Sequence, residues 1–261
     1  MDNKRYALVT GASKGIGFEL AKLLAQHNYN LILVARTQKD LETAAATFRQ
    51  NDIEVLIYPK DLFDYTMAYE IYSDLKQKGI SPEILVNDAG QGVYGKFQDT
   101  SIHRELDIIS LNIISPLILS KLFIEDRLPK KSGRILNLSS IASKAPGPWH
   151  SVYHGTKAFI QSFSEAVREE LKDQGITITT LLPGPTATDF FNKADMNESK
   201  ILENPLANPA EVAKDGFDAM MQGEDKVISG LKNKLQVWMS NLSTDEMAAH
   251  RMGEMQKPVN T

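Results

Sequence analysis

A tyrosine and a lysine four residues apart, Tyr153 and Lys157, are the side chains of this sequence best suited to acid–base chemistry. They fall in a run whose apolar residues recur at helical spacing, so they lie one turn apart on one side of a helix. A free phenol loses its proton only near pH 10, and a neighbouring ammonium favours the phenolate and lowers the tyrosine pKa. The pair therefore predicts a proton donor or acceptor that works near neutral pH. The spacing alone is common by chance and needs supporting residues.

A serine and an asparagine supply that support. Ser140 follows the apolar run Gly133–Leu138, which predicts a strand, and open α/β folds bind ligands at the carboxyl edge of the sheet. Asn112 lies in an otherwise apolar helical segment, where an amide needs a partner. That partner is either the reaction site or simply a water or a backbone group.

A glycine-rich turn links the first predicted strand to a helical segment. Gly11, Gly15 and Gly17 allow a tight turn and a close approach of the backbone to a pyrophosphate, and the helix N-terminus behind them offers free N–H groups. Their spacing, Gly-x-x-x-Gly-x-Gly, differs from the six-residue dinucleotide fingerprint. The turn predicts nucleotide binding, and the alternative is an ordinary turn.

An arginine ends the second predicted strand. In dinucleotide folds that prefer NAD, an acidic residue about 20 positions after the glycines bonds the ribose 2′-hydroxyl. Here the position holds Arg36, whose guanidinium suits a 2′-phosphate by charge and geometry. Lys14, inside the turn, could reach the same group. The pair indicates NADP(H), and the alternative is two solvated surface cations.

Together these motifs resemble the short-chain dehydrogenase/reductase family, over about residues 5–190. The resemblance implies that Tyr153 is the acid for carbonyl reduction and the base for alcohol oxidation, while Ser140 orients the substrate oxygen. It implies that Lys157 lowers the tyrosine pKa and binds the nicotinamide ribose, and that Asn112 holds a water for proton supply. Hydride arrival at a carbonyl carbon builds negative charge on oxygen, which positioned donors stabilise. No metal is needed, and the sequence has no metal-ligand spacing.

Three further segments match the family. Asp61 follows the third strand, where the family places an acid beside the adenine; from spacing alone it reads equally as a helix N-cap. Asn87–Gly90 follows the family pattern except at Asp88, which replaces the usual asparagine and puts its sheet-stabilising hydrogen bonds in doubt. Pro183–Thr188 resembles the segment that contacts the nicotinamide carboxamide. The residues expected to bind the cofactor are Gly11, Ser13, Lys14, Gly15, Ile16, Gly17, Arg36, Asp61, Leu62, Asn87, Ala89, Gly90, Tyr153, Lys157, Pro183, Gly184, Thr186 and Thr188.

Short β-rich runs alternate with helical segments along the chain. The predicted strands are Ala7–Thr10, Asn30–Ala35, Glu54–Pro59, Ile84–Asn87, Gly133–Leu138, Ile176–Leu182 and Lys226–Ile228, and the predicted helices are Gly17–His27, Thr37–Gln50, Asp64–Lys78 and Val152–Gln174. This order predicts an α/β class, single-domain Rossmann fold over 1–261: a doubly wound, mostly parallel sheet of about seven strands with helices on both faces. Residues 189–210 are expected to form a substrate lid, and 245–261 a C-terminal amphipathic helix with a frayed tail.

Substrate choice should depend on segments that the motifs do not fix, namely Gln91–Phe97, Ala145–His150 and Phe190–Leu206. Their aromatic and thioether side chains suit an apolar substrate or ordinary core packing, and they are Trp149, Phe190, Phe191 and Met196. The two histidines that flank Tyr153, His150 and His154, are expected on the helix surface.

Composition restricts the alternatives. A net charge of −4 and a pI near 5.8 argue against nucleic acid or an anionic membrane as partner. The absence of cysteine excludes disulfides and thiolate catalysis and suits a reducing cytoplasm. The N-terminus does not read as a signal peptide, and no stretch approaches the roughly 20 apolar residues of a membrane span. A soluble, cytoplasmic protein is expected.

Three functions stay open: an NADP(H)-dependent carbonyl reductase or alcohol dehydrogenase, a 3-oxoacyl-thioester reductase, and a non-catalytic NADP-sensing protein. The four catalytic candidates favour an enzyme, because a sensor needs no proton donor. The segment Leu231–Thr261 extends beyond the last strand, where relatives that act on 3-oxoacyl-carrier-protein often end, and this weakens that alternative. The resemblance also implies a homodimer, through the helix bearing Tyr153, or a homotetramer. Substrate, reaction direction and the role of residues 231–261 are not fixed by the sequence.

Overall fold

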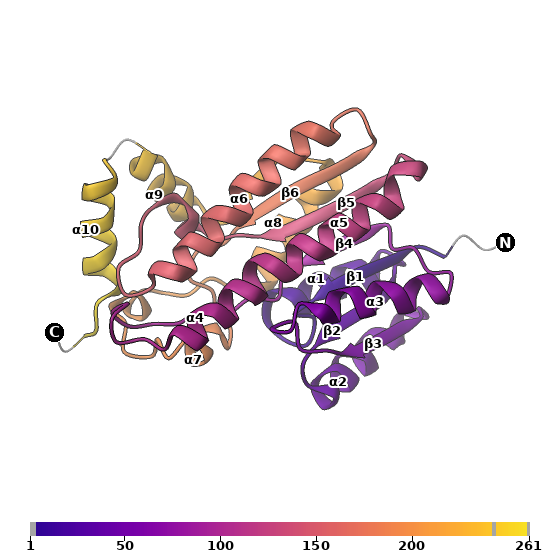
Figure 1. The fold of residues 1–261 in the computed structure, drawn as a ribbon, viewed down its shortest axis with the longest axis horizontal. Helices are drawn as coiled ribbons and strands as arrows, with labels where there is room; N and C mark the ends of the chain where they lie inside the picture. The colour runs from indigo at the N-terminus through magenta and orange to yellow at the C-terminus, as the bar shows by residue number, and fades with distance from the viewer. Residues whose placement is uncertain (1–3, 242–243, 260–261) are drawn as a thin grey trace.

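The protein is built on one seven-stranded parallel sheet, seen in a computed structural model that describes residues 4–241 and 244–259. The strand order is β3-β2-β1-β4-β5-β6-β7, and every neighbouring pair is parallel (Figure 1). The strands are β1 (Tyr6–Thr10), β2 (Asn30–Ala35), β3 (Val55–Pro59), β4 (Ile84–Asn87), β5 (Gly133–Leu138), β6 (Ile176–Leu182) and β7 (Lys226–Ile228). The predicted doubly wound Rossmann sheet is confirmed, and the chain order reverses between β1 and β4, which is where such folds bind ligands.

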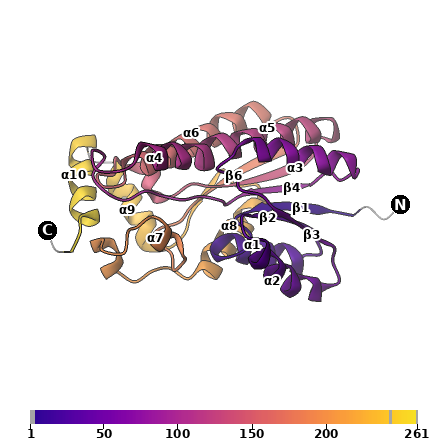
Figure 2. The same cartoon turned by 60° about the horizontal axis from the view of Figure 1, so that its bottom comes forward.

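Helices cover both faces of the sheet (Figure 2). Along β1 and β2, alternate residues enter opposite cores: Leu8 and Ile32 lie on one face, Val9 and Leu33 on the other. One core holds α1 (Gly15–Gln26), α2 (Gln38–Phe48) and α8 (Pro209–Gln222), and the other holds α3 (Thr66–Gln77), α5 (Ser115–Arg127) and α6 (Ser151–Leu171). Because both faces are buried, the strands read as unbroken apolar runs.

One long helical run covers part of the second face. It comprises α4 (Ile102–Ile109), a π-helical turn (Ser110–Ile114), α5 and a final 3₁₀ turn that ends at Lys130. By length and composition alone this run could cross a membrane, so the expectation that no stretch is apolar enough is wrong here. Leu119 and Phe123 from this run pack in the core beside β4 and β5, and 44% of its most apolar part is buried inside the protein.

The C-terminal part of the chain gathers at one end of the sheet. The short α7 (Phe190–Lys193), α9 (Leu231–Asn241) and α10 (Asp245–Gln256) lie there, beside the start of α6 (Figures 1 and 2). The chain has a helix at the predicted C-terminal segment, and the described residues after it contact the segment around Ser199. Pro258 pairs with Ser199, and the Val259 amide donates to the Glu198 carbonyl at 2.9 Å.

Candidate active site

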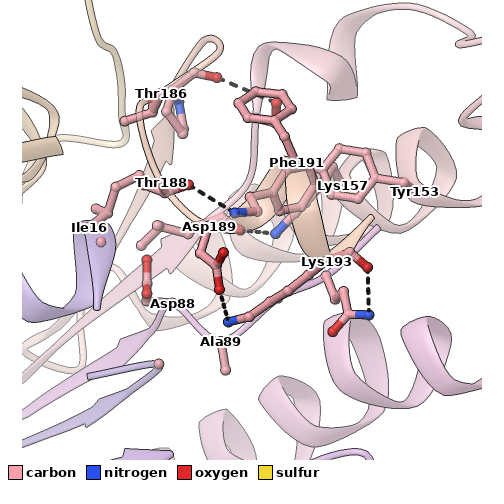
Figure 3. A pocket seen from close by; sticks show the side chains of 18 of the residues that line it. Ile16, Asp88, Ala89, Tyr153, Lys157, Thr186, Thr188, Asp189, Phe191 and Lys193 are labelled. Atoms are coloured by element: carbon pink, nitrogen blue, oxygen red, sulfur yellow. Dashed lines mark hydrogen bonds and ion pairs between the residues drawn. The ribbon is translucent and has the colours of Figure 1, made fainter. Parts of the chain in front are cut away.

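A cavity of about 490 Å³ opens along the carboxyl ends of the strands. Figure 3 shows side chains from the glycine turn, the segment after β4, α6 and the segment after β6 around this space. Of the predicted site residues, those that line it are Gly11, Ser13, Lys14, Gly15, Ile16, Arg36, Asp61, Leu62, Ala89, Gly90, Ser140, Tyr153, Lys157, Pro183, Gly184, Thr186 and Thr188. Gly17, Asn87 and Asn112 lie behind its wall. Sheet topology thus brings together motifs that are far apart in the sequence.

The glycine turn has the geometry of a phosphate cradle. Gly15 begins α1 with φ +65°, a backbone conformation that side chains disfavour. A Cβ on Gly17 would collide with the Gly11 carbonyl and with the Asp88 carboxylate, so only glycine fits there. The first turn of α1 holds no acidic residue. Its N-terminus can therefore face an anionic pyrophosphate.

The two cations expected at a 2′-phosphate have different surroundings. Arg36 is exposed at the rim of the cavity, with its guanidinium 5.2 Å from the centre of the Phe63 ring. Lys14 instead pairs with Asp40, with Nζ 3.0 Å from the carboxylate. Asp40 also lines the cavity and was not expected there. It lies four residues after Arg36, on the first turn of α2, and its charge offsets that of Lys14.

The Asp61-Leu62 pair also lines the cavity. The Asp61 carboxylate accepts the Phe63 amide at 3.1 Å. The alternative that Asp61 caps the next helix is wrong, because α3 begins at Thr66 and Asp64 accepts the Thr66 amide at 2.9 Å. Asp61 therefore stays a candidate for the adenine contact that the family resemblance implies.

Asn87 and Thr10 make most of the hydrogen bonds that hold the segment after β4. Asn87 turns its side chain away from the cavity and donates to Ser120 Oγ at 3.1 Å and to Asn137 Oδ1 at 2.8 Å. The hydroxyl of Thr10, which the sequence analysis did not single out, accepts the amides of Asp88 and Ala89, both at 3.1 Å. Thr10 and Asn87 thus tie this segment to β1 and β5.

Asp88 itself faces Lys157 beneath the glycine turn. Desolvation raises the pKa of its carboxyl to about 7, against the attraction of Lys157 and a hydrogen bond from the Gly17 amide. Desolvation also lowers the pKa of Lys157 to about 8, while Asp88 opposes that shift. Burial thus brings the pKa values of the two groups close to each other.

We predict that Asp88→Asn makes stability less dependent on pH. A carboxyl whose pKa is raised on folding binds its proton more tightly in the native state, so the free energy of unfolding falls as pH rises from about 4 to about 7. Urea unfolding should show the variant gaining on the order of 2 kcal/mol over the native chain between about pH 5 and pH 8. An identical difference at both pH values would contradict this assignment.

Ser140 and Tyr153 meet at the centre of the cavity. The Ser140 hydroxyl accepts the Ala142 amide at 3.1 Å, which fixes its rotamer at the end of β5, and it hydrogen-bonds Tyr153. The surroundings of Tyr153 raise its pKa to about 12, since desolvation outweighs the bond from Ser140. The expected lowering of this pKa by Lys157 is not seen. Lys157 Nζ lies 5.7 Å from the centre of the Tyr153 ring and donates to the Leu138 carbonyl at 2.8 Å.

Asn112 lies in the π-helical turn, behind Lys157. Its amide nitrogen donates to the Gln91 carbonyl at 2.8 Å and to Thr156 Oγ1 at 3.0 Å, and its oxygen accepts the Gln91 amide at 3.1 Å. A Cβ on Gly90 would lie 3.3 Å from Lys157 Nζ and 3.4 Å from Asn112 Oδ1. Asn112 thus joins the segment after β4 to α6, with backbone groups among its partners.

The prediction that His150 and His154 lie on the helix surface is wrong. Both are 3% exposed and line the cavity. His150 stacks on Tyr153 with ring centroids 4.3 Å apart, and burial lowers its pKa to about 3, so it is neutral. His154 bonds the Ala145 carbonyl through Nδ1 at 2.8 Å. The first turn of α6 is covered by segments distant in the sequence, which its own periodicity does not reveal.

The apolar candidates divide between two places. Phe190, Phe191 and Met196 line the cavity and also pack with one another. They are therefore core residues that also present apolar surface to the cavity. Trp149 is not in the cavity wall. It stacks on Tyr94 at 6.0 Å and lines a separate hollow beside α10.

The segment after β6 completes the wall. Thr186 donates its hydroxyl to the Gly184 carbonyl at 2.8 Å, and the Thr188 hydroxyl accepts the Phe190 amide at 3.4 Å. Asp189 and Lys193 form an ion pair across the first turn of the expected lid, at 3.5 Å. Figure 3 shows Thr186, Thr188, Asp189 and Lys193 around the cavity, with the ion pair drawn as a dashed line.

The sequence and the fold are similar to those of known proteins. The profile of the short chain dehydrogenase family matches residues 5–199. A very-long-chain 3-oxoacyl-CoA reductase of Mycosarcoma maydis is 34% identical over 181 residues, which make up 67% of this chain and 51% of the relative. This chain therefore spans about half the length of that relative.

Two solved structures extend the similarity to most of the chain. A short-chain dehydrogenase from Sphingobium yanoikuyae in complex with NADPH has 25% identity and a TM-score of 0.81, covering 92% of this chain and 96% of that one. A bulky-bulky ketone specific alcohol dehydrogenase from Comamonas testosteroni has 25% identity and a TM-score of 0.77, covering 95% and 98%.

Proposed function

The chain belongs to the short-chain dehydrogenase family, and from that premise we propose that it reduces a ketone or aldehyde to an alcohol, or the reverse, with NADP(H). The observation that carries the proposal is that Ser140, Tyr153 and Lys157 line the same cavity as the glycine turn. Arg36 at its rim and the NADPH-bound relative support NADP(H) over NAD(H).

The cavity fits such a cofactor. Gly11 and Gly15 line the cavity beside the start of α1, where the backbone could approach a pyrophosphate closely, and Arg36 at the rim would meet a 2′-phosphate. Lys157 and Thr188 would hold the nicotinamide end. When bound, the reduced cofactor would supply the hydride.

The chain's own residues would manage the proton. A pKa of about 12 keeps Tyr153 protonated at neutral pH, which is the state that carbonyl reduction requires. Its hydroxyl would donate to the carbonyl oxygen, and Ser140 would hold that oxygen as negative charge develops on it. Lys157, with a pKa near 8, can return a proton toward Tyr153.

A 3-oxoacyl-thioester reductase is the second candidate. It is favoured by the 34% identity to a very-long-chain 3-oxoacyl-CoA reductase. Phe190 and Met196, which line the cavity near Tyr153, suit an acyl chain. This activity would use the same residues on a different carbonyl substrate. A nucleotide sensor, the third alternative, would not need them.

A substrate screen tests the proposal. We expect NADPH to be oxidised in the presence of at least one class among aldehydes, ketones, quinones and 3-oxoacyl thioesters, and NADH to be used less well. The absorbance of the reduced cofactor is the measurement. Tight NADPH binding without turnover of any class would favour the sensor instead.

We also propose that the protein is a homodimer or homotetramer through α6. Phe159 on this helix is 40% exposed and stacks on Phe163 at 6.0 Å, and Leu117 on α5 is 37% exposed. Light scattering gives the mass, and a monomer at micromolar concentration would refute the proposal.

A further inference from the structure

The terminal helix α10 contributes directly to the wall of the active-site cavity. Met252, Met255 and Gln256 all line it, and Met252 is 8% exposed. Among the described residues of α10, none that reaches the cavity carries a charge. Two unbranched thioether chains form a surface that adapts to apolar groups.

Gln256 anchors this helix beside the catalytic tyrosine. Because His154 Nδ1 donates to the Ala145 carbonyl, its Nε2 is free to accept from the Gln256 amide, and those nitrogens are 2.9 Å apart. The backbone carbonyl of Gln256 accepts hydrogen bonds from Ser199 Oγ, at 3.0 Å, and from the Tyr94 hydroxyl. One buried residue thus joins α10 to α6, to the segment after β4 and to the expected lid.

The lid is anchored to the residues after α10 as well. The Lys200 amide donates to the Lys257 carbonyl at 3.1 Å, in addition to the Ser199–Pro258 pairing. The position of the wall is therefore set by contacts on three sides. A wall fixed in this way can limit the size of a ligand.

An apolar path leads from Tyr153 toward α10. The Phe190 ring lies 5.1 Å from the Tyr153 ring, and Met196 and Ile201 of the expected lid line the same cavity. His150, beside Tyr153, is neutral. A substrate with its carbonyl at Tyr153 would extend its substituent along these side chains.

We propose that α10 is the outer wall of the substrate compartment, and that Met252 and Met255 set the length of the apolar chain that the substrate carries beside its carbonyl. This inference rests on the proposed carbonyl reduction. It names the substrate class as carbonyl compounds with an extended apolar substituent.

The test compares Met255→Trp and Met255→Ala with control substitutions of Met247, which lies on the same helix but is 58% exposed and outside the cavity wall. Methyl ketones from butanone to dodecanone are assayed with saturating NADPH. We expect the tryptophan to lower kcat/KM for long ketones relative to butanone about ten-fold or more, and the alanine to shift preference toward longer chains. The Met247 variants should keep the native profile, and every variant should keep its NADPH affinity.

A binding measurement separates this inference from the proposed function. The same ketones are used to displace anilinonaphthalene sulfonate from the protein in the presence of NADP⁺. If the Met255 variants change the chain-length profile of binding although no ketone is reduced, the wall is supported and carbonyl reduction fails. If the Met255 and Met247 variants bind ketones with the same chain-length profile, or if no ketone binds the native protein, the proposed role of α10 is refuted.

Discussion

Replacing Tyr153 with phenylalanine should lower turnover by about 10²–10⁴-fold, the usual contribution of a positioned proton donor. The substitution removes one oxygen atom and keeps the ring, so the stacking on His150 and the contact with Phe190 remain. NADPH affinity should change little, because the glycine turn and Arg36 are untouched. The measurements are kcat on a substrate found by the screen and Kd for NADPH by calorimetry.

The matched control is Tyr69→Phe on α3, where the ring is 51% exposed. It should leave both kcat and Kd unchanged. A Tyr153→Phe enzyme that retains kcat within about two-fold would refute the assignment of Tyr153 as the general acid, because loss of a proton donor is expected to cost at least about 10²-fold.

The raised pKa of Tyr153 keeps this side chain in the protonated form that the proposed carbonyl reduction uses. With a pKa of about 12 the phenol is protonated throughout the physiological range, so it is ready to donate. Alcohol oxidation needs the phenolate, which the present position of Lys157 does not favour, since its ammonium is bonded to the Leu138 carbonyl. The rate of oxidation should therefore rise with pH more steeply than the rate of reduction.

The fold follows from local patterns in the sequence. Strands such as Asn30–Ala35 and Ile176–Leu182 have the predicted bounds, because a parallel strand covered on both faces is an uninterrupted apolar run. The bounds of the predicted helices differ from those in the structure by up to three residues. α8 and α9 were not predicted, and for α4 and α5 the sequence indicated only an apolar helical segment around Asn112. The buried face of α5 includes Ser120 and Arg127 while Leu117 is exposed, so its apolar residues form no clear stripe.

The positions of the site motifs could be predicted because each follows directly from a strand or a helix turn. Their partners could not. His154 meets Gln256 across 102 residues of sequence, and Thr10 meets Ala89 across 79. Such contacts depend on how distant segments pack, and the sequence around Gln256 or Thr10 gives no local signal of these roles. The contact of Asp40 with Lys14 could have been anticipated, because Asp40 follows Arg36 by four residues and its negative charge suits a nearby cation.

Arg36→Asp should weaken NADPH binding by about 10²-fold or more and NADH binding by only a few-fold. A charged hydrogen bond contributes about 1.5–3 kcal/mol, and a carboxylate in its place would repel the 2′-phosphate. Adding Lys14→Ala should enlarge the loss only modestly, because Asp40 already offsets the lysine charge at 3.0 Å. Calorimetric titration with both reduced cofactors gives the two Kd values.

Asp40→Ala provides the opposite test at the same place. Removing this carboxylate frees Lys14 to meet the 2′-phosphate, so NADPH should bind several-fold more tightly while NADH is unaffected. The gain should shrink as salt is added, because Lys14 is more than half exposed and its field is screened. If Arg36→Asp weakened both cofactors equally and Asp40→Ala changed neither, the rim of the cavity would not recognise the phosphate, and the preference for NADP(H) would have to be abandoned.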